Sequence, residues 1–448
     1  MIGRIDMVNK KLSLVAAVVA IGLTATACSS PAGSDDSSKS GGGGDAAETA
    51  ANELGINLAD CPTDPTEKLG EEIVVGNTVA LSGGPAAAFG PVRAGVSAAI
   101  NQMNAEAGYP TKFKLEVKDD QFMPDKALAG VQELVEKDKA EVMTNILGSA
   151  QVLATRQYLN DNCIPVITAT GNSADSSNTT DFPWVVNSIL QNPLDVKVWI
   201  EDAQKRFPDG AKVALMTSNT ESGKDVETQV KRFLEGTKLE LVAEQTIEAA
   251  DAGSPSSQIT TLRSSGADVL FLAPLATQCP TALKEADNQG WKPEIYLTNG
   301  CLSGAIIGAA GTAADGAHGT SWYKDPASPR WADDQAMIDA IAAIKEYGDP
   351  KLDDVSGVAV SGMIIGQGLL ESIEGAEKSP LGLSRLGLLD AAQHLNYQSP
   401  LALPGVHVRL DGLRDQVAVE AAYLQTWNTA DGGWDEGTLY DFEGQLTP

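Results

Sequence analysis

The residues best suited to chemistry in this 448-residue chain are its five cysteines and three histidines. They are Cys28, Cys61, Cys163, Cys279, Cys301, His318, His394 and His407. No CxxC pair occurs and the histidines are far apart, so the spacing predicts neither a metal site nor a nucleophile–histidine pair. GxSxG, HExxH and P-loop motifs are also missing. We therefore expect no catalytic residue, no metal and no cofactor, and a secreted enzyme is the weaker alternative.

Cys28 differs from the other cysteines in its surroundings. Positive charges between residues 4 and 11 precede an apolar stretch over 12–24, and Ala25-Thr26-Ala27 leads into the cysteine. This order resembles a bacterial lipoprotein signal, and the apolar stretch is shorter than the roughly 20 residues that span a bilayer. We expect a signal peptide over 1–27, acylation of the Cys28 thiol, and a lipid-anchored protein on the extracytoplasmic face of the cell membrane. Plain secretion, with Cys28 incidental, is the alternative.

The segment that follows Cys28 is rich in serine, glycine, aspartate and alanine. Its low apolar content indicates that it cannot bury enough surface to fold alone. The sequence therefore predicts a lipid-anchored flexible linker over residues 28–60.

The composition indicates a folded, acidic body. Hydrophobic residues make up 43% of the chain, and 60 acidic against 32 basic residues give a formal charge of −28. Removal of the signal peptide would take away a net charge of +2 and leave −30. Because nucleic-acid binding needs a basic face, nucleic acid is not expected as a partner.

Apolar segments with strand and helix periodicity alternate along the body. In the first half we predict strands at 72–81, 113–117, 142–147 and 164–168, and helices at 92–103, 127–135 and 150–159. The rhythm restarts with helices at 196–207, 226–234, 258–264 and after Pro280, and strands at 211–217, 239–244, 268–273 and 294–297. A long apolar helix at 358–373 and strands at 405–410 and 418–426 complete the chain. Such alternation predicts two α/β lobes with doubly wound parallel sheets, whose ligands bind beyond the carboxyl ends of the strands.

The four remaining cysteines suit two disulfides in an oxidising compartment, and their number alone allows three pairings. Cys61 precedes the first strand and Cys163 the fourth, so both lie near the amino ends of the first sheet. Cys279 and Cys301 each follow a strand of the second unit. We therefore predict the bridges Cys61–Cys163 and Cys279–Cys301.

Four segments of the first half are similar to a known family. They are LSGGPAAAFGPVRAGVSAAINQMNAEAG at 81–108, DDQFMPDKA at 119–127, LGS at 147–149 and IPVITATGNS at 164–173. Together they resemble the type I periplasmic solute-binding proteins, and especially the leucine/isoleucine/valine-binding branch that serves ABC importers.

The resemblance implies two lobes joined by a three-segment hinge that close over a small-molecule solute. It places the N-terminal lobe at 61–190 with 321–402 and the C-terminal lobe at 191–320 with 403–448. The break in the strand–helix rhythm near Gln191-Asn192-Pro193 agrees with this division. The implied partners are the permease and ATPase subunits of an ABC importer, and we expect a monomer. A sensor or receptor component with the same fold and no transport role is the alternative.

The family's ligand contacts matched to this sequence, together with the polar turn after the first strand that begins at Ser82, give a set of candidate ligand-binding residues. They are Ser82, Phe89, Ser149, Thr170, Asn172, Ser222, Leu275 and Asn299. By resemblance, Ser149, Thr170 and Asn172 would hold a carboxylate, as hydroxyl and backbone N–H groups at a helix start can do. Phe89 would cover the apolar part of the solute. The structural alternatives are a packing role for Phe89 and a helix N-cap role for Ser149.

The second lobe departs from the amino-acid binders. Asn299 stands where relatives have an acidic residue against the ligand's ammonium, and Ser222 stands where they have a tyrosine. An aromatic position falls on Leu275 or Ala276. These changes put a free amino acid in doubt, and Asn299 suits an amide, hydroxyl or carbonyl group. The expected solute is amino-acid-like, an amide or a small carboxylate.

In the first lobe, the adjacent aspartates Asp119 and Asp120 follow the strand predicted at 113–117. They are interpreted as turn and cap residues.

Overall fold

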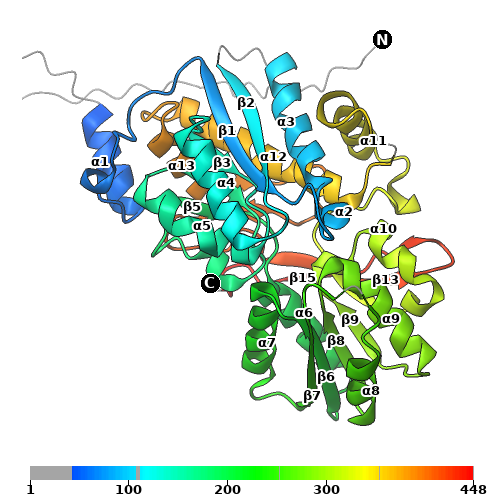
Figure 1. Ribbon diagram of the computed structural model, residues 1–448. Coiled ribbons are helices and arrows are strands. Elements are labelled where there is room, and N and C mark those ends of the chain that lie inside the picture. The colour runs from blue at the N-terminus through cyan, green and yellow to red at the C-terminus, as the bar shows by residue number, and fades with distance from the viewer. Residues whose placement is uncertain (1–42, 107–110, 252, 353, 447–448) are drawn as a thin grey trace, which may run out of the picture. The chain divides into compact units, whose positions relative to one another are not determined.

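The computed structural model describes residues 43–106, 111–251, 253–352 and 354–446 (Figure 1). The predicted signal peptide, Cys28 and the predicted linker up to residue 42 lie outside these ranges. Within them, no helix combines the length and the apolar character needed to span a membrane.

The first lobe is built on a parallel five-stranded sheet with the order β2-β1-β3-β4-β5. Its strands are β1 (Glu72–Val79), β2 (Lys112–Asp119), β3 (Val142–Thr144), β4 (Val166–Ala169) and β5 (Val185–Asn187). Helices α3 (Val92–Glu106) and α12 (Gly357–Lys378) cover one face, and α4 (Pro124–Glu136) and α5 (Ser149–Asp161) cover the other (Figure 1). Because both faces are covered, the central strands are buried on both sides, and most of their side chains are apolar.

The second lobe is built on an eight-stranded mixed sheet, in which β14-β13-β10-β9-β8-β6-β7 lie in order and β15 pairs with β13. Its strands are β6 (Ala211–Ser218), β7 (Leu239–Ile247), β8 (Val269–Ala273), β9 (Glu294–Leu297), β10 (His318–Ser321), β13 (Ala421–Asn428), β14 (Gly433–Trp434) and β15 (Thr438–Asp441). Helices α6 (Asn192–Arg206) and α7 (Glu221–Leu234) pack on one face, and α8 (Ser256–Ser264) and α9 (Cys279–Asn288) on the other. The remaining α-helices and strands are α1 (Gly43–Glu53), α2 (Ala86–Phe89), α10 (Gly304–Ile307), α11 (Gln335–Ala343), α13 (Arg385–Gln393), β11 (Asn396–Tyr397) and β12 (Val408–Arg409).

In its described part, the chain passes between the two lobes three times, after β5, after β10 and after β12. The second crossing runs antiparallel to residues 401–403, which precede β12. The N–H of Lys324 donates to the carbonyl of Leu401 (2.9 Å), and the N–H of Leu403 donates to that of Trp322 (3.0 Å). The predicted class of two doubly wound α/β lobes joined by a three-segment hinge is therefore confirmed. The residues at which the lobes divide stay a prediction.

The prediction of a flexible linker as far as residue 60 is wrong from residue 43 onward. Helix α1 buries Ala47, Ala50 and Ala51, Leu54 directly after it is also buried, and the helix packs against α13 of the first lobe. These four residues lie at i, i+3, i+4 and i+7, which is one face of a helix. Composition concealed the pattern because three of the four side chains are single methyl groups.

Both predicted disulfides are present. Cys61 bonds to Cys163 and Cys279 bonds to Cys301, with Cα–Cα distances of 5.5 and 5.9 Å. The first bridge lies near the amino end of β4, and the second joins the start of α9 to the short helical turn Asn299–Cys301 that follows β9.

Helices α3 and α12 contact each other through glycines. A Cβ atom on Gly95 would lie 2.0 Å from the carbonyl oxygen of Ala359, and one on Gly362 would lie 2.1 Å from that of Val92. Real Cβ atoms do not approach backbone so closely, so this contact requires glycine at both positions.

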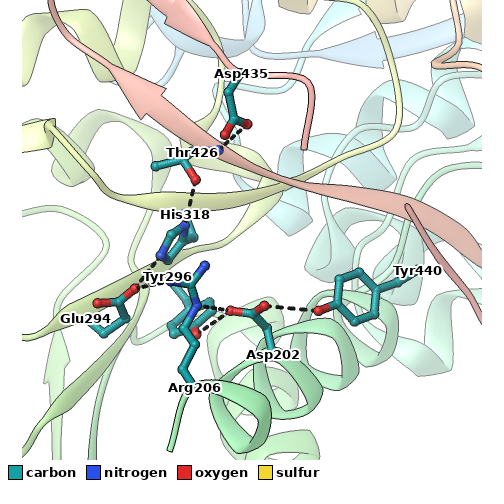
Figure 2. Close-up of polar contacts among 8 residues, drawn as sticks. All are labelled: Asp202, Arg206, Glu294, Tyr296, His318, Thr426, Asp435 and Tyr440. Carbon is teal, nitrogen blue, oxygen red and sulfur yellow. Dashed lines mark hydrogen bonds and ion pairs between the residues drawn. The ribbon is translucent and has the colours of Figure 1, made fainter. Parts of the chain in front are cut away.

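Figure 2 shows a polar network at the amino ends of β9 and β10. The hydroxyls of Tyr296 and Tyr440 donate to Asp202 of α6 at 2.8 and 3.0 Å, and His318 contacts Glu294. Burial favours the neutral acid, but these bonds and a nearby arginine outweigh it and hold the pKa of Asp202 below its usual range. Since ligands bind at the opposite, carboxyl ends of the strands, this network stabilises the second lobe.

Candidate functional site

The carboxyl ends of the two sheets border one cleft with two adjoining compartments. The larger has a volume of about 360 Å³ and the smaller about 130 Å³. They share the lining residues Phe89, Phe122, Gly148, Asn172 and Gly300. Both lobes contribute to each compartment, so a bound solute would contact both.

The structure brings together all but one of the predicted ligand-binding residues. Phe89, Ser149, Asn172, Ser222 and Leu275 line the larger compartment, and Phe89, Thr170, Asn172 and Asn299 line the smaller. Ser82 lines neither compartment, because its N–H and its hydroxyl both donate to Asp119. The prediction of a ligand contact at Ser82 therefore gains no support from the structure.

Ser149 is the first residue of α5 and is 5% exposed. Its Oγ accepts the N–H of Ser173 at 2.9 Å, which leaves the hydroxyl hydrogen for a ligand. Gly148 occupies the N-cap, so the alternative of Ser149 as the N-cap residue is wrong. The first N–H groups of a helix have no intrahelical acceptor and favour an anion. The start of α5 can therefore hold a carboxylate.

Thr170 and Asn172 are committed mainly to the protein. The Thr170 hydroxyl donates to the carbonyl of Ile146 at 2.9 Å, so it can only accept from a solute. The side chain of Asn172 donates an N–H to the carbonyl of Leu190 (3.1 Å). The backbone carbonyl of Asn172 accepts the N–H of Asn192 (2.8 Å). Asn172 thus links the cleft to the first crossing between the lobes.

Phe122 is a site residue that the sequence did not single out, although it lies in a segment that carries the family resemblance. Its ring stacks on that of Phe89 with centroids 4.9 Å apart. Its φ is 60°, which is uncommon for a bulky residue, and Asp120 Oδ1 accepts its N–H at 2.8 Å. Asp119 likewise accepts the N–H of Gln121 at 3.0 Å. The two aspartates hold this turn, as predicted, and burial raises the pKa of Asp120 to about 6.

On the second lobe, Asn299 is held by a carboxylate that the sequence analysis missed. Asp195 of α6 is fully buried, and its Oδ2 accepts the Asn299 N–H (3.0 Å), the Asn299 Nδ2 (3.3 Å) and the Thr298 hydroxyl (3.1 Å). Asp195 itself lines neither compartment. The wall at this position is therefore uncharged, and Asn299 keeps its side-chain oxygen for a solute.

Because Asp195 loses its proton as the pH rises, the stability of the protein should fall. Burial raises its pKa to about 7, against hydrogen bonds that lower it. The folded state then keeps a proton that the unfolded state loses above about pH 4, so the contribution is greatest below pH 4 and is lost as pH rises through 7. We compare the decrease in unfolding free energy from about pH 5 to pH 8 in the native protein and in Asp195→Asn. We expect the decrease to be larger in the native protein by up to about 2–3 kcal/mol. Urea unfolding at each pH measures this, and parallel profiles would contradict it. Asp120 and Glu420 also have raised pKa values. Both residues are present in the native protein and in Asp195→Asn, so their effects cancel in the comparison.

A second contact network ties the lobes together beside the cleft. Asn192 donates its side-chain N–H to Ser222 Oγ (3.2 Å) and to Asp225 Oδ2 (2.9 Å). Asp225 also accepts the N–H of Ala174, which belongs to the first lobe, at 3.2 Å. Burial raises the pKa of Asp225. Helix α7 is therefore joined to the first lobe through one carboxylate.

The compartments offer no unpaired charge among the described residues that line them. The charged members of the lining are Glu221 and Lys224, which form an ion pair with each other at 3.6 Å. The lining is otherwise made of apolar, hydroxyl and amide groups.

A family model described as periplasmic binding protein matches residues 72–433. The chain belongs to the periplasmic binding protein family. Members of this family act outside the cytoplasm and bind solutes, and the fold is of type I. No curated protein sequence matches this periplasmic binding protein.

Solved structures share the fold of this periplasmic binding protein at low sequence identity. A branched-chain amino acid ABC transporter protein from Thermus thermophilus with bound valine has a TM-score of 0.73 at 16% identity, covering 83% of this chain and 96% of its own. The leucine-binding protein LivK from Thermotoga maritima has a TM-score of 0.67 at 15% identity, covering 83% and 99%. A solute-binding protein from Rhodopseudomonas palustris in complex with 3,4-dihydroxybenzoic acid has a TM-score of 0.70 at 19% identity, covering 83% and 98%.

Proposed function

We propose that this protein is a monomeric, extracytoplasmic solute-binding lipoprotein that captures a small organic carboxylate and delivers it to the permease and ATPase subunits of an ABC importer. The observation that carries the proposal is the composition of the cleft. One lobe offers the start of α5 with the free hydroxyl hydrogen of Ser149, and the other offers the uncharged Asn299.

Capture proceeds by hinge closure. The solute first contacts Ser149 and the aromatic pair on the first lobe, and groups of the second lobe near Ser222 and Asn299 then favour the closed state. A ligand must prefer the closed form by roughly 5.5 kcal/mol to shift the lobes from about 1% to 99% closed. Hydrogen bonds to both walls and apolar burial against Phe89 and Leu275 contribute to that preference.

The solute carries no α-ammonium group. The solved structures with bound valine and 3,4-dihydroxybenzoic acid show that this fold serves both amino acids and acids without an amine. An ammonium buried without a charged partner costs roughly 2–5 kcal/mol. Asn299 supplies no charge, and Glu221 is already paired with Lys224.

Attachment to the membrane uses Cys28 after removal of residues 1–27. The support is the sequence order of basic residues, apolar stretch and small residues before the cysteine. Partitioning of the full-length chain into a detergent phase tests this attachment, and recovery in the aqueous phase after processing would contradict it.

The test of the ligand class is a thermal-shift and calorimetric panel on residues 43–448. We expect one or more carboxylates that carry no other charged group to bind with micromolar affinity or better. Free leucine should bind at least ten-fold more weakly. A ligand present at one hundred times its dissociation constant adds about 2.7 kcal/mol of stability, which a thermal shift detects. If leucine were the best ligand and bound with micromolar affinity, the proposal that the solute carries no α-ammonium group would be wrong.

A further inference from the structure

Gln151 is a buried polar residue of the larger compartment whose side chain has nothing to bind. It is the third residue of α5, it is 1% exposed, and it lines the cavity. Across the described ranges, its side-chain amide makes no hydrogen bond. Its amide atoms are not among the fully buried unpartnered atoms, so the amide opens to the cavity, where water or a polar group of a solute can bind it.

The usual structural role for a glutamine at this position is ruled out. At the third position of a helix, glutamine can accept the backbone N–H of the N-cap residue and complete a capping box. Here the N-cap is Gly148, and its N–H donates instead to the carbonyl of Thr170 at 3.1 Å. No side-chain hydrogen bond caps this helix start.

The amide of Gln151 lies between the carboxylate-binding helix start and the aromatic pair. A Cβ atom on Gly148 would be 2.2 Å from Gln151 Oε1 and 3.0 Å from the ring of Phe122. Gly148 has a φ of 110°, a backbone conformation that disfavours any residue with a Cβ atom. The free amide therefore lies where the body of a solute held at Ser149 would begin.

We infer that Gln151 determines specificity by hydrogen bonding to a neutral polar group of the solute, a hydroxyl or a carboxamide. The ligand class is then a hydroxy- or amide-substituted organic acid. This inference rests on the proposed function and names the substrate class of the same cleft. An amide both donates and accepts, and it carries no charge, so it binds such groups without favouring an ammonium. A site built to bond a hydroxyl rejects the analogue that lacks it, because its own polar group is then left unpaired.

The test compares acids in matched pairs on the native protein and on variants. The probes are 4-hydroxybenzoate with benzoate, 2-hydroxy-4-methylpentanoate with 4-methylpentanoate, and succinamate with butanoate. Gln151→Leu keeps the size of the side chain and removes the amide, and Gln151→Met is a second variant of similar volume. Gln157→Leu is the matched control, because Gln157 lies on the same helix, is exposed, and bonds to Asp161.

We expect the native protein and Gln157→Leu to bind the substituted member of at least one pair ten-fold or more tightly than the plain acid. Both Gln151 variants should lose that preference and bind the plain acid within about three-fold of the native protein. Equal affinities of the native protein for both members of every pair overturn the inference alone. An equal loss for both members in the Gln151 variants also overturns it, because that pattern indicates a structural role. Binding of none of the acids contradicts the proposed ligand class, and the inference falls with it.

Discussion

The Ser149→Asp variant should fold normally and bind the native solute at least a thousand-fold more weakly. Aspartate in the first turn of α5 is favourable for the helix, since the exposed N–H groups there stabilise negative charge. The same charge faces the carboxylate of the solute. Two like charges about 4 Å apart at a partly solvated site repel by about 4 kcal/mol, which corresponds to about a thousand-fold in affinity. Calorimetry with the best acid of the panel measures the loss, and urea unfolding measures the fold.

The matched control is Gln335→Glu. It adds the same charge at the first position of α11, where residue 335 is exposed and lines neither compartment. We expect its affinity to stay within two-fold of the native value. Retained binding by Ser149→Asp would show that the carboxylate is held elsewhere. An equal loss in both variants would indicate an effect of net charge alone.

Removal of the Cys279–Cys301 bridge should weaken solute binding as well as stability. The bridge fixes the turn that carries Asn299 against the start of α9, close to Leu275 of the cleft wall. Its loop of 22 residues corresponds to about 3.4 kcal/mol in the chain-entropy account. We expect Cys279→Ala combined with Cys301→Ala to weaken solute binding at least ten-fold, since the wall is no longer held in its binding geometry.

The other bridge gives the matched comparison. Cys61–Cys163 spans 102 residues, corresponds to about 4.7 kcal/mol, and lies at the end of the first sheet away from the cleft. Its double alanine variant should lose more stability and keep its affinity when measured well below its melting temperature. Calorimetry and urea unfolding on both double variants decide the matter. Equal affinities in the two would contradict a role of the second bridge in the cleft.

The sequence predicted the elements and much of the cleft for one physical reason. The carboxyl ends of parallel strands meet at one edge, so polar turns after successive strands, such as Ser149 and Asn172, had to converge. The lobes and both cysteine pairs followed from the same ordering of strand ends. Short segments with mixed character, such as β10 and α13, gave no clear periodicity and were not predicted.

The residues that sequence reasoning missed depend on contacts between distant segments. Asp195 is separated from Asn299 by 104 residues, and nothing near either residue indicates that they meet. Ser82 was assigned to the cleft by its place after the first strand, but Asp119 binds it instead. Phe122 could have been found, because a phenylalanine just after paired aspartates in a turn at a strand's carboxyl end has few apolar neighbours other than the cleft.

The glycine contact between α3 and α12 constrains how this cleft can change over evolution. Val358, Ser361 and Ile365 of α12 form one wall of the smaller compartment, while Gly362 of the same helix touches the backbone of α3. That wall cannot retreat to admit a bulkier solute without separating the two helices. From the second lobe, the loop after β9 lines the smaller compartment and the loop after β8 lines the larger one, and loops tolerate substitution more readily. New solute specificities should therefore arise mainly by mutation of the second lobe, and a library that diversifies those loops is the more productive route to an altered binding protein.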